Sequence, residues 1–89
     1  MIETHLEVTF RKGKALAAYL YLPRKPRERS HRSVVAAPGL VVDYTRAGKP
    51  IGIELTSPGT VTLAAVNRVL RAVGAEPVRR VDLMPLLAA

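Results

Sequence analysis

The stretch from Leu40 to Leu55 decides the fold, and it reads LVVDYTRAGKPIGIEL. Residues 40–44 and 51–55 each alternate with the period of a half-buried strand, and a polar turn separates them. That turn fits a type I geometry followed by Gly48 in the left-handed region, which is common in slightly longer hairpin loops. The stretch therefore predicts a β-hairpin with one apolar face.

Four residues of this hairpin raise further questions. Pro50 has no N–H to donate, so the second strand begins at Ile51 or has a free edge there. Gly52 suits a β-bulge or a close approach of the helix to the strand. Asp43 and Glu54 fall on the face opposite the apolar one. They are either cross-strand neighbours forming a carboxylate pair for acid–base chemistry or, as we favour, the routine polar positions of a half-exposed hairpin.

Further strands are expected before the hairpin. Residues 6–10 alternate between apolar and polar, and 34–37 form a short apolar run. Residues 15–22 are apolar on both faces, which predicts a central strand covered on both sides. One helix covers only one side, so a partner chain would cover the other. Tyr19 and Tyr21 share one face of this strand and lie either in the core or at a subunit or partner interface.

A single amphipathic helix follows the hairpin, within residues 57–74. Ser57 or Thr60 is its expected N-cap, and Gly74 is its expected stop. Between them, over residues 60–73, the apolar side chains recur at helical spacing and form a stripe: Leu63, Val66, Val69, Leu70 and Val73. The remaining tail, 75–89, holds large apolar residues that we expect to pack on the domain or on a partner.

These elements predict an α+β fold in one domain, 1–89, with its sheet core in 6–56. The sheet is an antiparallel β-meander of three to four strands, and the helix packs on one face. The doubly apolar 15–22 strand and the apolar tail predict a homo-oligomer, most simply a dimer.

The net charge of +7 is concentrated in one stretch of the 89-residue chain. Residues 11–32 hold eight basic side chains against Glu28 alone, which accounts for the whole excess. Within it, 23–32 has two prolines and no periodicity and reads as an exposed loop. Its basic residues are candidate contacts to an acidic partner or to phosphate, or they are simply solvated: Arg24, Lys25, Arg27, Arg29 and Arg32. The loop has no aromatic residue for base stacking, which disfavours nucleic acid.

Composition and motifs exclude several classes of function. Without cysteine there are no disulfides and no thiolate metal sites, and no run approaches the roughly 20 apolar residues of a membrane helix. The N-terminus lacks the features of a signal peptide, so we expect a cytoplasmic protein. His5 and His31 have no metal-binding spacing, and no nucleophile elbow, Walker loop or dinucleotide fingerprint occurs. We therefore expect no enzyme activity, no cofactor and no metal site.

Three segments together resemble a prokaryotic family of small proteins known only as a domain of unknown function. They are AAYLYL (17–22), PGLVVDY (38–44) and GIEL (52–55), and they fit an A-x-Y-[IL]-x-L strand and a V-x-D-[YF]-x-x-x-G-x-x-x-G-I-E hairpin over about residues 6–56. Leu16 and Thr45 stand where the family often has Asp, and Pro50 is less usual there. The motif positions in this chain are Tyr19, Asp43, Tyr44, Gly48, Gly52 and Glu54.

The resemblance implies a β-rich core without established enzyme activity. Some family members look like partners of small toxin-like proteins, which implies an antitoxin-type role by analogy. The leading hypothesis is a self-associating protein-interaction module, with 23–32 and the tail as its likeliest contacts. The alternative is an accessory nucleic-acid-binding protein that uses the basic 11–32 stretch.

Overall fold

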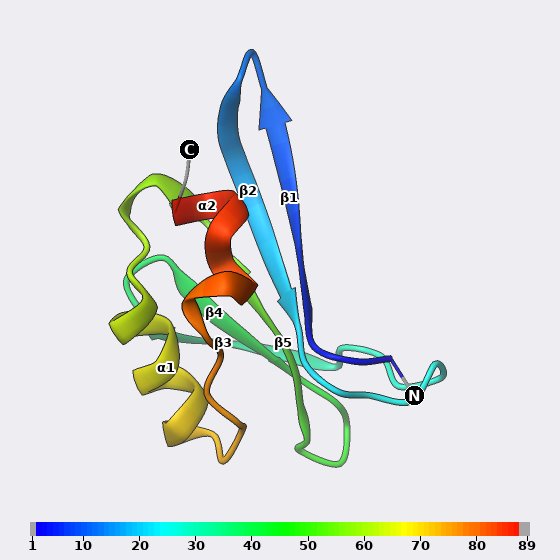
Figure 1. The fold of residues 1–89 in the computed structure, drawn as a ribbon. Helices are drawn as coiled ribbons and strands as arrows, with labels where there is room; N and C mark the ends of the chain where they lie inside the picture. The colour runs from blue at the N-terminus through cyan, green and yellow to red at the C-terminus, as the bar shows by residue number, and fades with distance from the viewer. Residues whose placement is uncertain (1, 88–89) are drawn as a thin grey trace.

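The computed structural model describes residues 2–87, which form a five-stranded antiparallel sheet with short helices after it (Figure 1). The strands are β1 (His5–Arg11), β2 (Lys14–Tyr21), β3 (Arg32–Ala37), β4 (Leu40–Tyr44) and β5 (Pro50–Leu55). The helices are the 3₁₀ turns η1 (Pro58–Thr60) and η2 (Arg80–Leu83), and the α-helices α1 (Leu63–Ala72) and α2 (Met84–Leu87). The α+β class is confirmed, but the sheet has five strands where three to four were predicted.

The strand order, β1-β2-β5-β4-β3, differs from a simple meander. Strands β3, β4 and β5 do form one, and the β1–β2 hairpin joins it by pairing β2 with β5. The middle strand is therefore β5, and the 15–22 segment lies one place away from it. At Pro50 itself β5 pairs with Tyr44 of β4, whereas its ladder with β2 ends at Gly52, so the predicted free edge at Pro50 is found on the β2 side. The strand begins at Pro50 itself, and the next residue, Ile51, is an extra residue in the ladder with β4.

The core lies on one face of the sheet. Leu20, Val42 and Ile53 are fully buried there, one from each of three adjacent strands. They belong to the same cluster as Val66 and Leu70 of α1. Figure 1 shows α1 and the η2–α2 segment on this side of the sheet. The alternation of each strand therefore places the residues between these core positions on the opposite face.

The N-cap of helix α1 lies two residues after Thr60 and five after Ser57, the two predicted caps. Thr62 is its N-cap, and its hydroxyl oxygen accepts a hydrogen bond from the N–H of Ala65 at 3.1 Å. The prediction of Ser57 or Thr60 was wrong because Pro58 starts a separate 3₁₀ turn, which ends at Thr60. The helix ends as predicted before Gly74, and the N–H of Ala75 reaches back to the carbonyl of Leu70 at 2.8 Å. No helix within residues 2–87 combines the length and apolar character needed to cross a membrane.

The tail folds back onto the sheet. Val78, Leu83 and Leu86 are buried in the core cluster, whereas Val81 remains 60% exposed. Asn67 of α1 holds the start of the tail: its side-chain amide donates to the carbonyl of Val78 at 3.0 Å and its oxygen accepts from the N–H of Val78 at 2.8 Å. Of the two alternatives for the tail, packing on its own domain is what residues 75–87 show. Residues 88–89 lie outside the described part of the chain.

The 23–32 segment, which its composition predicted to be an exposed loop, makes several hydrogen bonds to the rest of the chain. Arg24 pairs with Ile2 through two backbone hydrogen bonds of 2.7 and 3.0 Å. Glu28 closes a turn by accepting from the N–H of Lys25 at 2.8 Å, and its carboxylate also binds Lys49 at 2.7 Å. At its end the segment enters the sheet, since β3 begins at Arg32. Polar side chains, which carry no periodic signal, supply much of this order.

Candidate functional site

The face of the sheet opposite α1 holds most of the motif residues, and we call it the open face. Asp43, at its centre, is only 6% exposed. Its two carboxylate oxygens accept hydrogen bonds from the Ser33 hydroxyl at 2.6 Å and the Tyr19 hydroxyl at 2.8 Å. A buried carboxylate is costly unless such donors compensate it. This group of three side chains therefore ties β2, β3 and β4 together.

Gly52 makes the Tyr19–Asp43 contact sterically feasible. Strand β5 lies between β2 and β4, so the Tyr19 side chain must cross β5 to reach Asp43. It crosses at Gly52, where an added Cβ would overlap the Tyr19 hydroxyl and ring. The predicted close approach at Gly52 is thus real, but the approaching group is a tyrosine on the open face and not the helix. The predicted bulge lies one position earlier, at Ile51.

Glu54 lies beside this group, directly opposite Tyr19 in the β2–β5 ladder. Asp43 pairs with Gly52 and Glu54 with Val41, so the two carboxylates are diagonal neighbours rather than opposite each other. Burial, and then the charge of Asp43, raise the pKa of Glu54 above its usual 4.5. Proximity of two carboxylates disfavours charging both.

The chemistry of this group favours a structural role. Burial and the adjacent Asp43 carboxylate also raise the pKa of Tyr19, so its hydroxyl stays protonated and donates. Both oxygens of Asp43 are occupied by hydroxyl donors. Across residues 2–87, no three His, Cys, Asp or Glu side chains gather as metal ligands.

Tyr21 extends the open face toward β1. Its ring stacks on His5 with centroids 4.4 Å apart and meets the Tyr19 ring edge-on at 4.7 Å. The guanidinium of Arg24 lies 5.2 Å from the Tyr21 ring centroid, within cation–π range. Neither tyrosine belongs to the core cluster. Core packing, one of the two alternatives for this pair, is therefore not what the structure shows.

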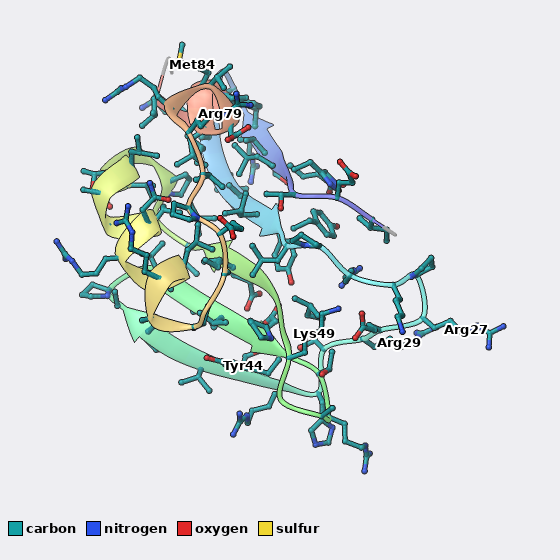
Figure 2. All side chains as sticks on the ribbon, turned by 60° about the horizontal axis from the view of Figure 1, so that its bottom comes forward. Arg27, Arg29, Tyr44, Lys49, Arg79 and Met84 are labelled. Carbon is teal, nitrogen blue, oxygen red and sulfur yellow. The ribbon has the colours of Figure 1, made fainter. Side chains whose placement is uncertain are left out.

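The candidate basic contacts are dispersed. Arg24 lies on Tyr21, and Arg32 lies 5.0 Å from the ring centroid of Tyr44, the motif residue on the core side of β4. Lys25 contributes its backbone N–H to the Glu28 turn. Only Arg27 and Arg29 line a common concavity, and Figure 2 shows both on the loop beside Lys49, away from Arg79 and Met84. The basic stretch therefore does not form one continuous surface.

The last motif residue, Gly48, has the predicted place in the hairpin turn. Its φ is +89°, in the left-handed region, and its N–H donates to the carbonyl of Thr45 at 2.9 Å. It supports the turn geometrically and lies outside the open-face group. Of the six motif positions, the structure brings four together on the open face: Tyr19, Asp43, Gly52 and Glu54.

The two edges of the sheet differ in character. Within residues 2–87, β3 pairs only with β4 and β1 only with β2. On β3, Val34 is 42% exposed and Val35 70% exposed. The sequence carries no charge from Ser33 to Ala37, whereas β1 has Glu7 and Arg11. From Ser33 to Ala37, strand β3 is thus an uncharged edge with two exposed valines, and its one charge, Arg32, is at its first residue.

Sequence reasoning missed several residues of these surfaces. Ser33 was not singled out, although it lies opposite Asp43 in the β3–β4 ladder. His31 and Arg46 were not associated with Arg27 and Arg29, although all four line one concavity. The pairing of Ser33 with the buried Asp43 could have been predicted from the sequence only if the register between β3 and β4 had been known.

Compared with models of protein families, with curated proteins and with solved structures, the chain matches none of them. The resemblance to a family of unknown function stays a prediction.

Proposed function

We propose that the protein is a non-catalytic protein-interaction module that self-associates through the edge strand β3. The observation that carries this proposal is the exposure of Val34 and Val35 on an edge that has no charged residue from Ser33 to Ala37. Edge strands present unpaired backbone groups that template pairing with another chain. A second copy supplies the same strand, so two β3 strands pair antiparallel around a two-fold axis.

The opposite edge lacks these properties. Strand β1 carries Glu7 and Arg11, whereas the charge on β3 is Arg32 at the first residue of the strand. Edge charges are a feature by which proteins discourage edge pairing. The contrast favours β3 as the contact.

The open face is a poorer surface for a second copy. Asp43 and Glu54 lie together on it, and the Glu7 carboxylate is within 3.4 Å of the Tyr21 hydroxyl. Two copies placed face to face across a two-fold axis would bring these like charges together, which is unfavourable. A dimer formed through β3 does not require the partner chain to cover the second face of β2.

The test is the oligomeric state of a Val35→Lys variant. We expect light scattering to give a dimer for the natural sequence at micromolar concentration and a monomer for Val35→Lys, because a lysine on the edge opposes strand pairing. Val81→Lys is the matched control, since Val81 is 60% exposed but lies in the tail. A monomeric natural protein, or a Val35→Lys variant that remains dimeric, would contradict the proposal.

Two further readings remain proposals. An antitoxin-like role, which the family resemblance implies, is one case of such an interaction module. Accessory nucleic-acid binding is favoured by one observation, the shared concavity of Arg27 and Arg29. The lack of cysteine supports a cytoplasmic setting.

A further inference from the structure

We propose that the protein also binds a phosphate group, in the open concavity between the 25–31 loop and the β4–β5 turn. The concavity measures about 400 Å³. Three arginines line it, Arg27, Arg29 and Arg46, together with Ser30 and His31. Guanidinium groups present paired N–H donors that match phosphate oxygens.

The charge of this concavity is uncompensated. Its one acidic lining residue, Glu28, is already engaged, because its carboxylate binds Lys49 Nζ at 2.7 Å and the N–H of Lys25 at 2.8 Å. With the Glu28 and Lys49 charges cancelling, the three arginines leave a local charge of +3. A cluster of this kind attracts anions over several ångströms.

The two walls are held in place by the fold. The N–H of His31 donates to the carbonyl of Tyr44 at 2.8 Å, which fixes the end of the loop beside the turn. The turn itself is closed by the N–H of Thr45, which donates to the carbonyl of Lys49 at 2.9 Å. A backbone arranged before binding loses less entropy when a ligand arrives. In Figure 2, Arg27 and Arg29 extend from this loop on the side away from the helices.

The chemistry recognised is a phosphate group, carried either by a small molecule or by a nucleic-acid backbone. An amide NMR titration at low salt distinguishes the sources, with inorganic phosphate in one arm and a short single-stranded oligonucleotide in the other. We expect both probes to shift the amides of residues 27–31 and 45–47. Oligonucleotide binding much tighter than phosphate binding assigns the nucleic-acid source, and comparable affinities assign a small phosphate-bearing ligand.

The variant that tests the site is the double substitution R27Q/R29Q. We expect it to weaken oligonucleotide or phosphate binding roughly tenfold or more, since two charge-assisted contacts are removed. For the single-stranded oligonucleotide, the slope of log affinity against log salt falls by about 0.7 for each arginine removed. R68Q/R71Q on α1 is the matched control, because it removes the same charge at exposed positions elsewhere.

Two results would overturn the proposal. One is the absence of amide shifts in residues 27–31 and 45–47 with either probe at low salt. The other is an equal loss of binding in R68Q/R71Q, which would mean that net charge and not this concavity attracts the phosphate.

Discussion

Gly52 and Tyr19 act as one unit at the scale of single residues. The tyrosine spans β5 only because position 52 has no side chain, and its reach places a hydroxyl on the buried Asp43. The group therefore depends on steric room as much as on hydrogen-bonding chemistry. This gives Gly52 a role that its backbone conformation alone does not explain.

Gly52→Ala is expected to lower the free energy of unfolding by about 1–3 kcal/mol, because Tyr19 must move and its hydrogen bond to Asp43 is lost. Urea denaturation measures the change. In a Tyr19→Ala background the same substitution costs less, since the overlapping ring is gone. Gly59→Ala is the control, as an added Cβ there meets open space. Equal costs in both backgrounds would contradict this account of the unit.

Glu54 gives the open face a pH dependence. Its raised pKa means that the folded chain binds this proton more tightly than the unfolded chain does. Stability therefore increases as the pH falls through the raised pKa toward the usual 4.5, and the penalty is complete at neutral pH. Glu28 has the opposite sign: its backbone contact to Lys25 and its contact to Lys49 lower its pKa, so its contribution to stability is lost as the pH falls from the usual 4.5 through the lowered pKa.

Glu54→Gln is thus expected to stabilise the protein at neutral pH, by less than about 1 kcal/mol because the group is only partly buried, and to flatten the pH dependence down to about pH 5. Chemical denaturation at neutral pH and at about pH 5 measures the free energy of unfolding of both proteins and checks this. Glu76→Gln, an exposed substitution in the tail, should leave the pH dependence unchanged. A Glu54→Gln variant less stable than the natural protein at neutral pH would show that the carboxylate stabilises the fold.

At the scale of elements, α1 is joined to the tail by one buried polar side chain. Asn67, only 9% exposed, satisfies both the N–H and the carbonyl of Val78. The helix and the tail are apolar enough to pack in several ways, and this pair of hydrogen bonds selects one. An asparagine on the buried side of a helix is therefore the specific link between two otherwise generic surfaces.

Asn67→Ala is expected to cost about 2–3 kcal/mol, because it leaves two buried backbone groups of Val78 unpaired. Arg68→Ala, at an exposed position of the same helix, should change stability by no more than about 0.5 kcal/mol. Thermal and urea denaturation of both variants make the comparison. Similar losses in the two would mean that the hydrogen bonds to Val78 do not stabilise the tail.

For the whole molecule, small size and an uneven charge distribution matter most. A chain of 89 residues has a stability of only a few kcal/mol, so association adds a substantial fraction. The proposed β3 contact therefore predicts a melting temperature that rises with protein concentration, and a Val35→Lys variant in which that dependence is lost. Acidic groups meet on the open face, whereas arginines gather at the concavity, so the two surfaces suit different partners.

Elongation is a further property of the whole molecule. Its principal extents are 37 × 23 × 22 Å, and Figure 1 shows the β1–β2 hairpin projecting beyond the other strands. Phe10 and Leu16 near its tip are 50% and 57% exposed. The periodicity of the sequence predicts strands at these residues, but it does not show that β1 and β2 extend beyond the other strands of the sheet.

Local patterns in the sequence determined the α+β class, the 40–55 hairpin with its Gly48 turn, and the end of the helix at Gly74. These features follow from the alternation of apolar and polar residues and from turn chemistry. Both depend only on residues that are close together in the sequence. The N-cap was missed by two residues from Thr60 and by five from Ser57, because several cap residues compete within 57–62 and only packing selects among them.

The tertiary structure alone decided the strand order and the composition of both candidate surfaces. A two-residue turn at Pro38-Gly39 would place Ser33 opposite Tyr44, but the extra residue Ala36 shifts the register by one and places Ser33 opposite Asp43. The insertion of β5 between β2 and β4 then makes Gly52 the crossing point for Tyr19. A one-residue shift leaves no trace in composition or periodicity, and long-range pairing is set by the energy of the whole sheet.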